Sequence, residues 1–463
     1  MPNTQLPITI KETREGLLTK KFSAVELVDE YLKNIEENKD LNAFITVCDE
    51  EAYKKAKAVD SLVNAGVSGN QYPMLGSVIA HKDLFLTKGV RTTAASKVLE
   101  SYIPQYSATV VKKYDQEGSI MIGKTNSDAW AHGASGENSD FGPTLNPRNK
   151  KYVPGGSSSG SAVAVAANLS LVSTGTDTGG SIRQPANFCG VVGLKPTYGA
   201  VSRYGVIAMA SSLDTVGAFA NSVEDVETMF EVTKGEDGLD STVKNHESDK
   251  LTTKDASKIK IGIPKEYLTE GLDHEVEKSV QETMKVLKKE GVEFVDISLP
   301  HTKYAISVYY IIQPAEVSSN LERYDGIRFG NPRASFGAEA KRRIMLGTYV
   351  LSAGFYDAYY LKAQKVRSKL IEDFDLAFSK VDAIIAPVSP TPAFKLGEKA
   401  EDPLKMYLAD IFTASANLAG IPGLAIPSGA TKLGLPLGFQ LLGPKFSENT
   451  LFELGKLYQK ITK

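Results

Sequence analysis

The stretch Ser77-Val78-Ile79-Ala80-His81-Lys82-Asp83 is a short apolar strand that runs directly into charged residues. Two further apolar segments of this kind follow, Ser119 to Ile122 and Leu169 to Val172. Between these segments, Ser107 to Tyr114 and Gly160 to Asn168 are predicted to be helices. Strands that alternate with helices predict an α/β fold, in which helices cover both faces of a central sheet.

The amino-acid composition changes along the chain and indicates three regions around these strands. Residues 1–70 are predicted to be helical, and Ser23-Ala24-Val25-Glu26 forms a capping box there. A Gly- and Ser-rich core spans about 71–235, and the polar stretch Glu236 to Lys258 is predicted to be a surface connection. Long helices are predicted from Tyr304 to Leu321 and from Ala338 to Phe378. The sequence contains no repeat and no low-complexity segment. We therefore expect a single large domain over residues 1–463, with a helical insertion at about 300–380.

The bulk composition is that of an ordinary globular enzyme, with 42% hydrophobic and 23% charged residues among 463. A net charge of -2 disfavours a strong grip on nucleic acid by this chain alone. Cys48 and Cys189 lie far apart and outside any CxxC pair, so we expect neither a disulfide framework nor a thiolate metal site. The N-terminus lacks a signal pattern, and no apolar run reaches about 18 residues. These features predict a cytoplasmic protein without a membrane anchor.

Two stretches are unusually rich in Gly and Ser: Pro154-Gly155-Gly156-Ser157-Ser158-Ser159-Gly160-Ser161 and the segment Thr176 to Pro185. In the second, Gly179 and Gly180 directly precede Ser181. Glycines there leave a serine hydroxyl uncrowded and let neighbouring N–H groups face a developing oxyanion. One such stretch alone is more often a flexible loop, but two in succession favour a catalytic site.

A phosphate site is the rival interpretation, because Gly118 to Thr125 matches G-x-x-x-x-G-K-[ST]. Its four middle residues are mainly apolar strand formers, whereas a phosphate cradle needs a flexible turn that leads into a helix. No obvious helix opens after Thr125. We therefore predict a strand here and no nucleotide site.

A serine nucleophile needs a base. None of the five histidines lies in a triad motif, and no G-x-S-x-G elbow occurs in a strand-to-helix setting. Lys82 is the remaining candidate, because it ends an apolar strand, where partial burial would lower its pKa toward the neutral, basic form. Taken alone, such a lysine is more often on the surface.

Together these residues resemble the amidase signature family. That family has a lysine after a strand, then G-G-S-S-x-G, then G-G-S-[IV]-R-x-P. Here the three parts are Lys82, Gly155 to Gly160 and Gly179 to Pro185. The resemblance implies the amidase signature fold, with a mixed sheet, and a serine hydrolase that needs no metal.

The resemblance also implies roles for individual residues. Ser181 would be the nucleophile, and Lys82 the base that acts through Ser157, a residue that usually follows a cis peptide bond in this family. Asp177 and Arg183 would brace the loop. The oxyanion hole would be formed by backbone N–H groups around Thr178, Gly179, Gly180 and Ser181.

Further segments resemble the glutaminase subunits of tRNA-dependent amidotransferases. They are Gly123 to Asn126, Glu137 to Ser139, Ser318 to Gly330, Lys341 to Thr348 and Tyr407 to Pro422. In such an assembly the glutaminase hydrolyses glutamine and passes ammonia to one of its two partners, subunits B and C. The B subunit uses ATP and Mg to amidate a misacylated tRNA, either Glu-tRNA(Gln) or Asp-tRNA(Asn). This resemblance implies both partners, and no cofactor in this chain.

Glutamine carries a carboxylate and an ammonium group, and the resemblance implies that Arg343 binds the first and Asp410 the second. The ordinary interpretations are a helix-surface arginine and a helix N-cap. Arg342 is the neighbouring alternative for the carboxylate.

The chain departs from the family pattern at Ser159, where glycine is commoner, and in a short segment between Gly330 and Phe336. Two other functions stay open. A stand-alone amidase for another small carboxamide would keep the triad without needing both Arg343 and Asp410. A catalytically dead scaffold would have no use for the triad.

Overall fold

The computed structural model describes residues 6–68, 71–245, 258–268, 271–328, 330–399 and 402–462. Within these residues, eleven strands join in one sheet. They are β1 (Phe44–Val47), β2 (Val78–Lys82), β3 (Ile120–Thr125), β4 (Val172–Asp177), β5 (Val192–Lys195), β6 (Thr215–Ala220), β7 (Lys260–Pro264), β8 (Glu293–Ile297), β9 (Ala383–Pro387), β10 (Gly423–Ala430) and β11 (Pro436–Leu442). Their order across the sheet is β1-β3-β2-β4-β6-β5-β10-β11-β9-β7-β8.

The sheet is mixed, and its parallel part positions the site. β2 lies parallel to both β3 and β4, whereas β4 pairs with β6 in the antiparallel sense. Parallel neighbours end at the same edge of a sheet. The last residues of β2 and β4, Lys82 and Asp177, therefore both lie at that edge.

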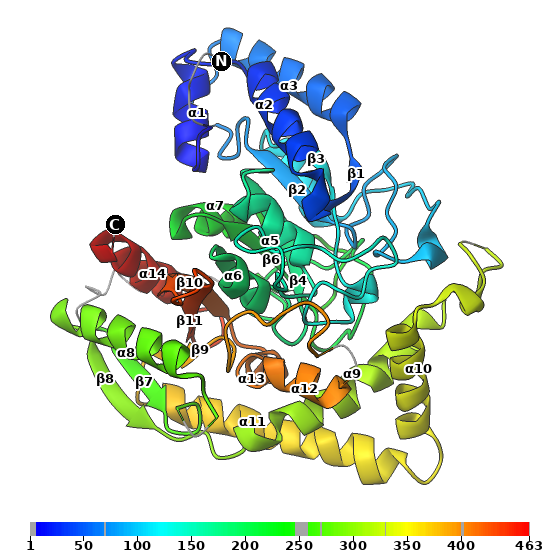
Figure 1. Cartoon of the computed structure of the whole chain (residues 1–463), viewed down its shortest axis with the longest axis vertical. Helices are drawn as coiled ribbons and strands as arrows, with labels where there is room; N and C mark the ends of the chain where they lie inside the picture. The colour runs from blue at the N-terminus through cyan, green and yellow to red at the C-terminus, as the bar shows by residue number, and fades with distance from the viewer. Residues whose placement is uncertain are drawn as a thin grey trace.

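Helices cover both faces of this sheet (Figure 1). α5 (Ser159–Ala166) and α6 (Arg183–Cys189) pack together on one face, while α7 (Val223–Thr233) and α14 (Glu448–Thr462) pack together on the other. Strand β10 separates the two layers, because successive residues of a strand point to opposite faces. Its first residue, Gly423, lies against Arg183 of α6, and the next, Leu424, lies against Gly455 of α14.

The remaining α-helices pack around this central part of the fold (Figure 1). They are α1 (Ile10–Leu18), α2 (Ala24–Glu37), α3 (Asp49–Asn64), α4 (Thr109–Gln116), α8 (His274–Lys289), α9 (Ala305–Leu321), α10 (Ala338–Leu351), α11 (Lys362–Phe378), α12 (Pro403–Tyr407) and α13 (Ala414–Ala419). No helix in the described parts of the chain is both long and apolar enough to cross a membrane.

The predicted α/β class and the capping box of α2 are confirmed. The strand predicted from Leu169 to Val172 is wrong, because β4 begins only at Val172 and continues through a polar but fully buried segment. A single helix from Ala338 to Phe378 is also wrong. The chain turns after α10 at Gly354, whose φ is +84°, and then forms a π-helix at Tyr356–Leu361 before α11.

The polar stretch predicted as a surface connection, residues 236–258, is described only up to residue 245 and at residue 258. Its first part is tied to the core, since Asp240 forms an ion pair with Arg203 at 2.9 Å. The residues between 245 and 258 lie outside the described structure. The division into helical, catalytic and inserted regions stays a prediction.

A substitution in β6 tests how closely the central strands pack. A Cβ on Gly217 would come 2.0 Å from the Leu194 carbonyl oxygen and 2.9 Å from Ile182. Gly217→Ala is therefore expected to lower the free energy of unfolding by about 1–3 kcal/mol, measured by chemical denaturation. The control is Gly337→Ala, whose new methyl would approach only Asp140, at 3.5 Å. It should change stability by less than about 1 kcal/mol, and equal effects would contradict the packing described.

Candidate active site

Lys82 lies at the end of β2, and its ammonium nitrogen is fully buried among hydroxyl groups. Nζ donates to Ser157 Oγ at 2.8 Å, Ser158 Oγ at 2.9 Å and Thr176 Oγ1 at 2.9 Å. The two serines come from the loop before α5, and Thr176 comes from the parallel strand β4. The Gly156–Ser157 peptide bond is cis. The surface location considered for this lysine is therefore wrong.

The surroundings of Lys82 favour its neutral form. Burial lowers its pKa to about 7, although the carboxylates of Asp128, Asp177 and Asp214 act in the opposite direction. A lysine with this pKa is partly unprotonated at neutral pH and can accept a proton. The arrangement can thus act as a base on the Ser157 hydroxyl.

Ser181 lies on the turn between β4 and α6, against the loop that carries Ser157. The backbone N–H of Ser158 donates to the Ser181 carbonyl oxygen at 3.2 Å, which holds the two loops together. Ser181 is 8% exposed, whereas Lys82 and Ser157 are fully buried. Of the three residues, the predicted nucleophile is therefore the one nearest to solvent.

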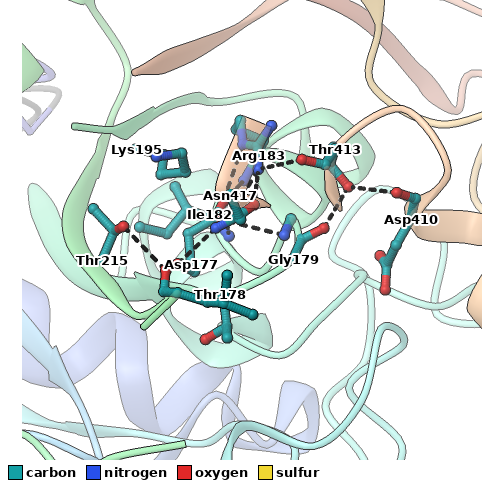
Figure 2. A network of polar contacts seen from close by, with 12 residues as sticks. Asp177, Thr178, Gly179, Ile182, Arg183, Lys195, Thr215, Asp410, Thr413 and Asn417 are labelled. Carbon is teal, nitrogen blue, oxygen red and sulfur yellow. Dashed lines mark hydrogen bonds and ion pairs between the residues drawn. The ribbon is translucent and has the colours of Figure 1, made fainter. Parts of the chain in front are cut away.

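Asp177 holds the turn that carries Ser181 (Figure 2). Its carboxylate accepts the N–H groups of Gly180 at 2.9 Å and Ile182 at 3.1 Å. It also forms an ion pair with the buried Arg183 at 3.1 Å. Burial alone would raise the pKa of Asp177, but the Arg183 guanidinium overcomes this and lowers it to about 2. The predicted bracing role of this pair agrees with these contacts.

The contacts of Asp177 also revise the predicted oxyanion hole. The Gly180 N–H points to the Asp177 carboxylate and is not available to a substrate oxygen. The N–H groups of Gly179 and Ser181 are not among those that Asp177 holds. We therefore drop Gly180 and keep Thr178, Gly179 and Ser181 as candidate donors.

The segment around α13 connects this turn to Asp410, one of the two predicted glutamine-binding residues (Figure 2). Thr413 donates through Oγ1 to the Gly179 carbonyl oxygen at 2.6 Å and to the Asp410 carbonyl oxygen at 3.2 Å. Asn417 accepts from Arg183 at 2.6 Å and donates to Asp177 at 2.9 Å. One buried network therefore fixes both Asp410 and the turn that carries Ser181.

Arg343 and Asp410 both contact Tyr310 of α9. The Arg343 guanidinium lies 5.5 Å from the centre of the Tyr310 ring, and the Tyr310 hydroxyl donates to Asp410 at a long 3.5 Å. Arg343 is buried, while the side chain of Arg342 is 45% exposed and pairs with Glu339. Of the two arginines, only Arg343 is thus buried beside Tyr310. Asp410 ends a short 3-10 helix and is not the N-cap of α13, which is Thr413.

The charges near Tyr310 are only partly balanced. Burial raises the pKa of Asp410 to about 8, although Arg343 acts to lower it. A cation beside Asp410 would favour its charged form. A cavity of about 250 Å³ opens here, lined among others by His132, Tyr310, Arg343 and Tyr407.

The phosphate-loop match is a strand, as predicted, because Ile120 to Thr125 form β3. Its lysine, Lys124, is fully buried and pairs with Asp83 at 3.3 Å. The same ammonium group donates to Thr92 and to the Phe85 carbonyl oxygen, at 2.7 Å each. This lysine therefore stabilises buried polar groups inside the fold.

Sequence analysis missed several residues that shape the site. Ser158 and Thr176 lie inside the two Gly- and Ser-rich motifs, next to residues that were predicted to be functional. Their position in the sequence could therefore have indicated that they contact Lys82. Asn417 lies 240 residues from Asp177, and only the fold reveals that the two are hydrogen-bonded. Tyr310 likewise carried no local signal.

A buried lysine on a serine hydroxyl, beside a Gly-Gly-Ser turn, defines an amidase-type hydrolase. The chain belongs to the Amidase family, whose model matches residues 26–452. This confirms the predicted resemblance and the predicted fold class.

Several proteins of known name are similar to this chain over almost its whole length. The A subunit of glutamyl-tRNA(Gln) amidotransferase from Koribacter versatilis is 51% identical, over 96% of this chain and 97% of that protein. The protein of the same name from Geobacter metallireducens is 50% identical, over 98% and 97%. The solved structure of the Thermotoga maritima protein of that name is 39% identical, with a TM-score of 0.83 over 99% and 96% of the two chains. A peptide amidase from Stenotrophomonas maltophilia shares 28% identity and a TM-score of 0.83, over 98% and 96%.

Removing the negative charge of Asp177 tests the bracing network. Asp177→Asn would leave Arg183 buried and unpaired, so it should lower the free energy of unfolding by about 3–5 kcal/mol. Asp40→Asn is the control, because Asp40 forms a solvent-exposed ion pair with Lys150, and its loss should change the free energy of unfolding far less. Chemical denaturation measures both, and similar losses would contradict the role assigned to Asp177.

Proposed function

We propose that this chain hydrolyses glutamine as the glutaminase subunit of a glutamyl-tRNA(Gln) amidotransferase. The contact of Lys82 with Ser157 at 2.8 Å carries the chemical part of the proposal. The relatives at about 50% identity, which cover almost the whole chain, support the biological part. A stand-alone amidase is the alternative that the experiments below distinguish.

In the proposed reaction, neutral Lys82 takes the proton of Ser157, and Ser157 takes that of Ser181. The Ser181 oxygen then attacks the carboxamide carbon of glutamine. The N–H groups of Thr178, Gly179 and Ser181 stabilise the resulting oxyanion. The proton returns through Ser157 to the leaving nitrogen, so ammonia departs, and water hydrolyses the remaining ester to glutamate.

Recognition of glutamine follows from charge. Arg343 binds the α-carboxylate and Asp410 the α-ammonium, on either side of Tyr310. Burial of Asp410 supports this assignment, because a buried carboxylate without a partner cation is costly unless a ligand supplies one. Arg343 already pairs with Glu339 at 2.8 Å and keeps further N–H groups for a ligand. The raised pKa of Asp410, about 8, means that the ammonium group binds as Asp410 loses its proton.

The proposed partners are amidotransferase subunits B and C. The B subunit would hold most of the misacylated tRNA and use ATP and Mg to activate its carboxylate. The net charge of -2 is consistent with a partner that carries the tRNA. In this proposal the chain contributes ammonia and needs no cofactor of its own.

Ser181→Ala tests the division of labour. In an assembly with both partner subunits, ATP and Glu-tRNA(Gln), the variant should lose glutamine-dependent amidation by at least about a thousandfold. Amidation supplied with free ammonia should survive, because the later chemistry needs only ammonia. Both rates are measured as Gln-tRNA(Gln) formed, and loss of both would contradict the proposal.

The wild-type chain provides the reference in that experiment. Ammonia release from glutamine should rise strongly when both partner subunits, ATP and the misacylated tRNA are added. Unstimulated turnover of many simple amides, with glutamine no better than the rest, would favour the stand-alone amidase.

Asp410→Asn tests recognition of the ammonium group. The variant should lower kcat/KM for glutamine by about tenfold or more, the cost of a charged hydrogen bond. Glutaramic acid, which lacks the ammonium group, should be affected by less than about threefold. Equal losses on both substrates would remove Asp410 from the recognition site. In the wild type, KM for glutamine should fall as the pH rises toward 8, and this trend should be absent from the variant.

A further inference from the structure

His132 is a buried histidine that the catalytic scheme does not use. It is completely buried, and within the described structure neither ring nitrogen has a hydrogen-bond partner. A buried imidazole without a partner is costly, because its polar atoms have left water with nothing in exchange. Such a group takes its missing partner from an ordered water or from a ligand.

The backbone leading to His132 is held in an unusual conformation. Trp130 and Ala131 both have positive φ angles, 59° and 63°, which residues other than glycine seldom adopt. The Trp130 ring packs against Phe336 at 5.3 Å, and the Asn138 side chain donates to the His132 carbonyl oxygen at 2.7 Å. Two strained residues persist only where their surroundings hold them, and they concentrate at functional sites.

The segment from Asp128 to His132 contacts Ser157 at its first residue and lines a cavity with Arg343 at its last. The N–H of Asp128 donates to the Ser157 carbonyl oxygen at 3.1 Å, four residues before His132. His132 lines the cavity of about 250 Å³ with Tyr310 and Arg343. His132 therefore lines the same cavity as Arg343, the residue proposed to bind the glutamine carboxylate.

Arg343 alone does not offer enough N–H donors for the carboxylate that it is proposed to bind. Its Nε donates to Glu339 at 2.8 Å and one Nη1 N–H donates to Gln313 at 2.9 Å, so two of its five N–H donors are used and three remain. The Gln313 amide nitrogen is itself buried and, among the described residues, has no partner. A carboxylate has about four acceptor positions, so it needs more donors than the rest of Arg343 offers.

We propose that His132 is a specificity-determining residue, whose ring N–H donates to the carboxylate that Arg343 binds in glutamine. This inference rests on the proposed glutaminase function. Burial and the nearby Arg343 charge keep the pKa of His132 well below its usual value, so the ring is neutral. A neutral imidazole offers one N–H donor without adding a second buried charge.

His132→Phe tests the inference, because it fills similar space without a donor. In the enzyme assembled with its partner subunits, kcat/KM for glutamine should fall about tenfold or more, mainly through KM. The matched substrate is 4-aminobutanamide, which is glutamine without its carboxylate, and its kcat/KM should change by less than about threefold. His132→Gln, which keeps an N–H donor, should recover most of the loss on glutamine.

The outcomes are distinct. A loss confined to glutamine supports the inference. An equal loss on both substrates, or no loss on either, overturns it and leaves His132 a structural residue. If the phenylalanine variant does not fold, His132→Leu is judged by the same comparison. A wild-type enzyme that does not hydrolyse glutamine would instead overturn the proposed function itself.

Discussion

The burial of the Lys82 ammonium group at the sheet edge is the constraint on which the rest of the site depends. A lysine in water holds its proton at neutral pH and cannot act as a base. Here three hydroxyl groups replace water around Nζ, and burial lowers the pKa to about 7. The sheet makes this possible, because parallel β2 and β4 end side by side and the loop before α5 covers their ends.

The second requirement is a rigid turn for Ser181, the proposed nucleophile. Asp177 and Arg183 provide it from within the turn, and Asn417 and Thr413 secure it from a segment more than 200 residues later. The same segment carries Asp410. Chemistry and recognition therefore share one buried network, so a change that loosens the turn should also displace the recognition residues.

Helix α9 ties the recognition pocket to the oxyanion loop. The Tyr309 ring lies so close to Gly179 that a Cβ there would come within 2.7 Å of it. One position further on, Tyr310 contacts Arg343 and Asp410, and Gln313 accepts a hydrogen bond from Arg343 one helical turn later. A glutamine bound among these side chains would have its carboxamide directed toward the same loop.

The sequence by itself determined the α/β class, and it predicted Lys82, Ser157 and Ser181 as the proposed catalytic residues and Asp177 and Arg183 as the bracing pair, because local motifs carry these features. It did not determine β5, β6 and β11, which are buried along their whole length and so lack an alternating pattern, or β10, whose first four residues are all buried. Only the tertiary structure decided that the Gly180 N–H is hydrogen-bonded to Asp177 and that Asn417 reaches the same carboxylate. It also decided that the His132 ring has no hydrogen-bond partner among the described residues. Each of these depends on what lies across space from a polar atom, and sequence spacing does not encode that distance.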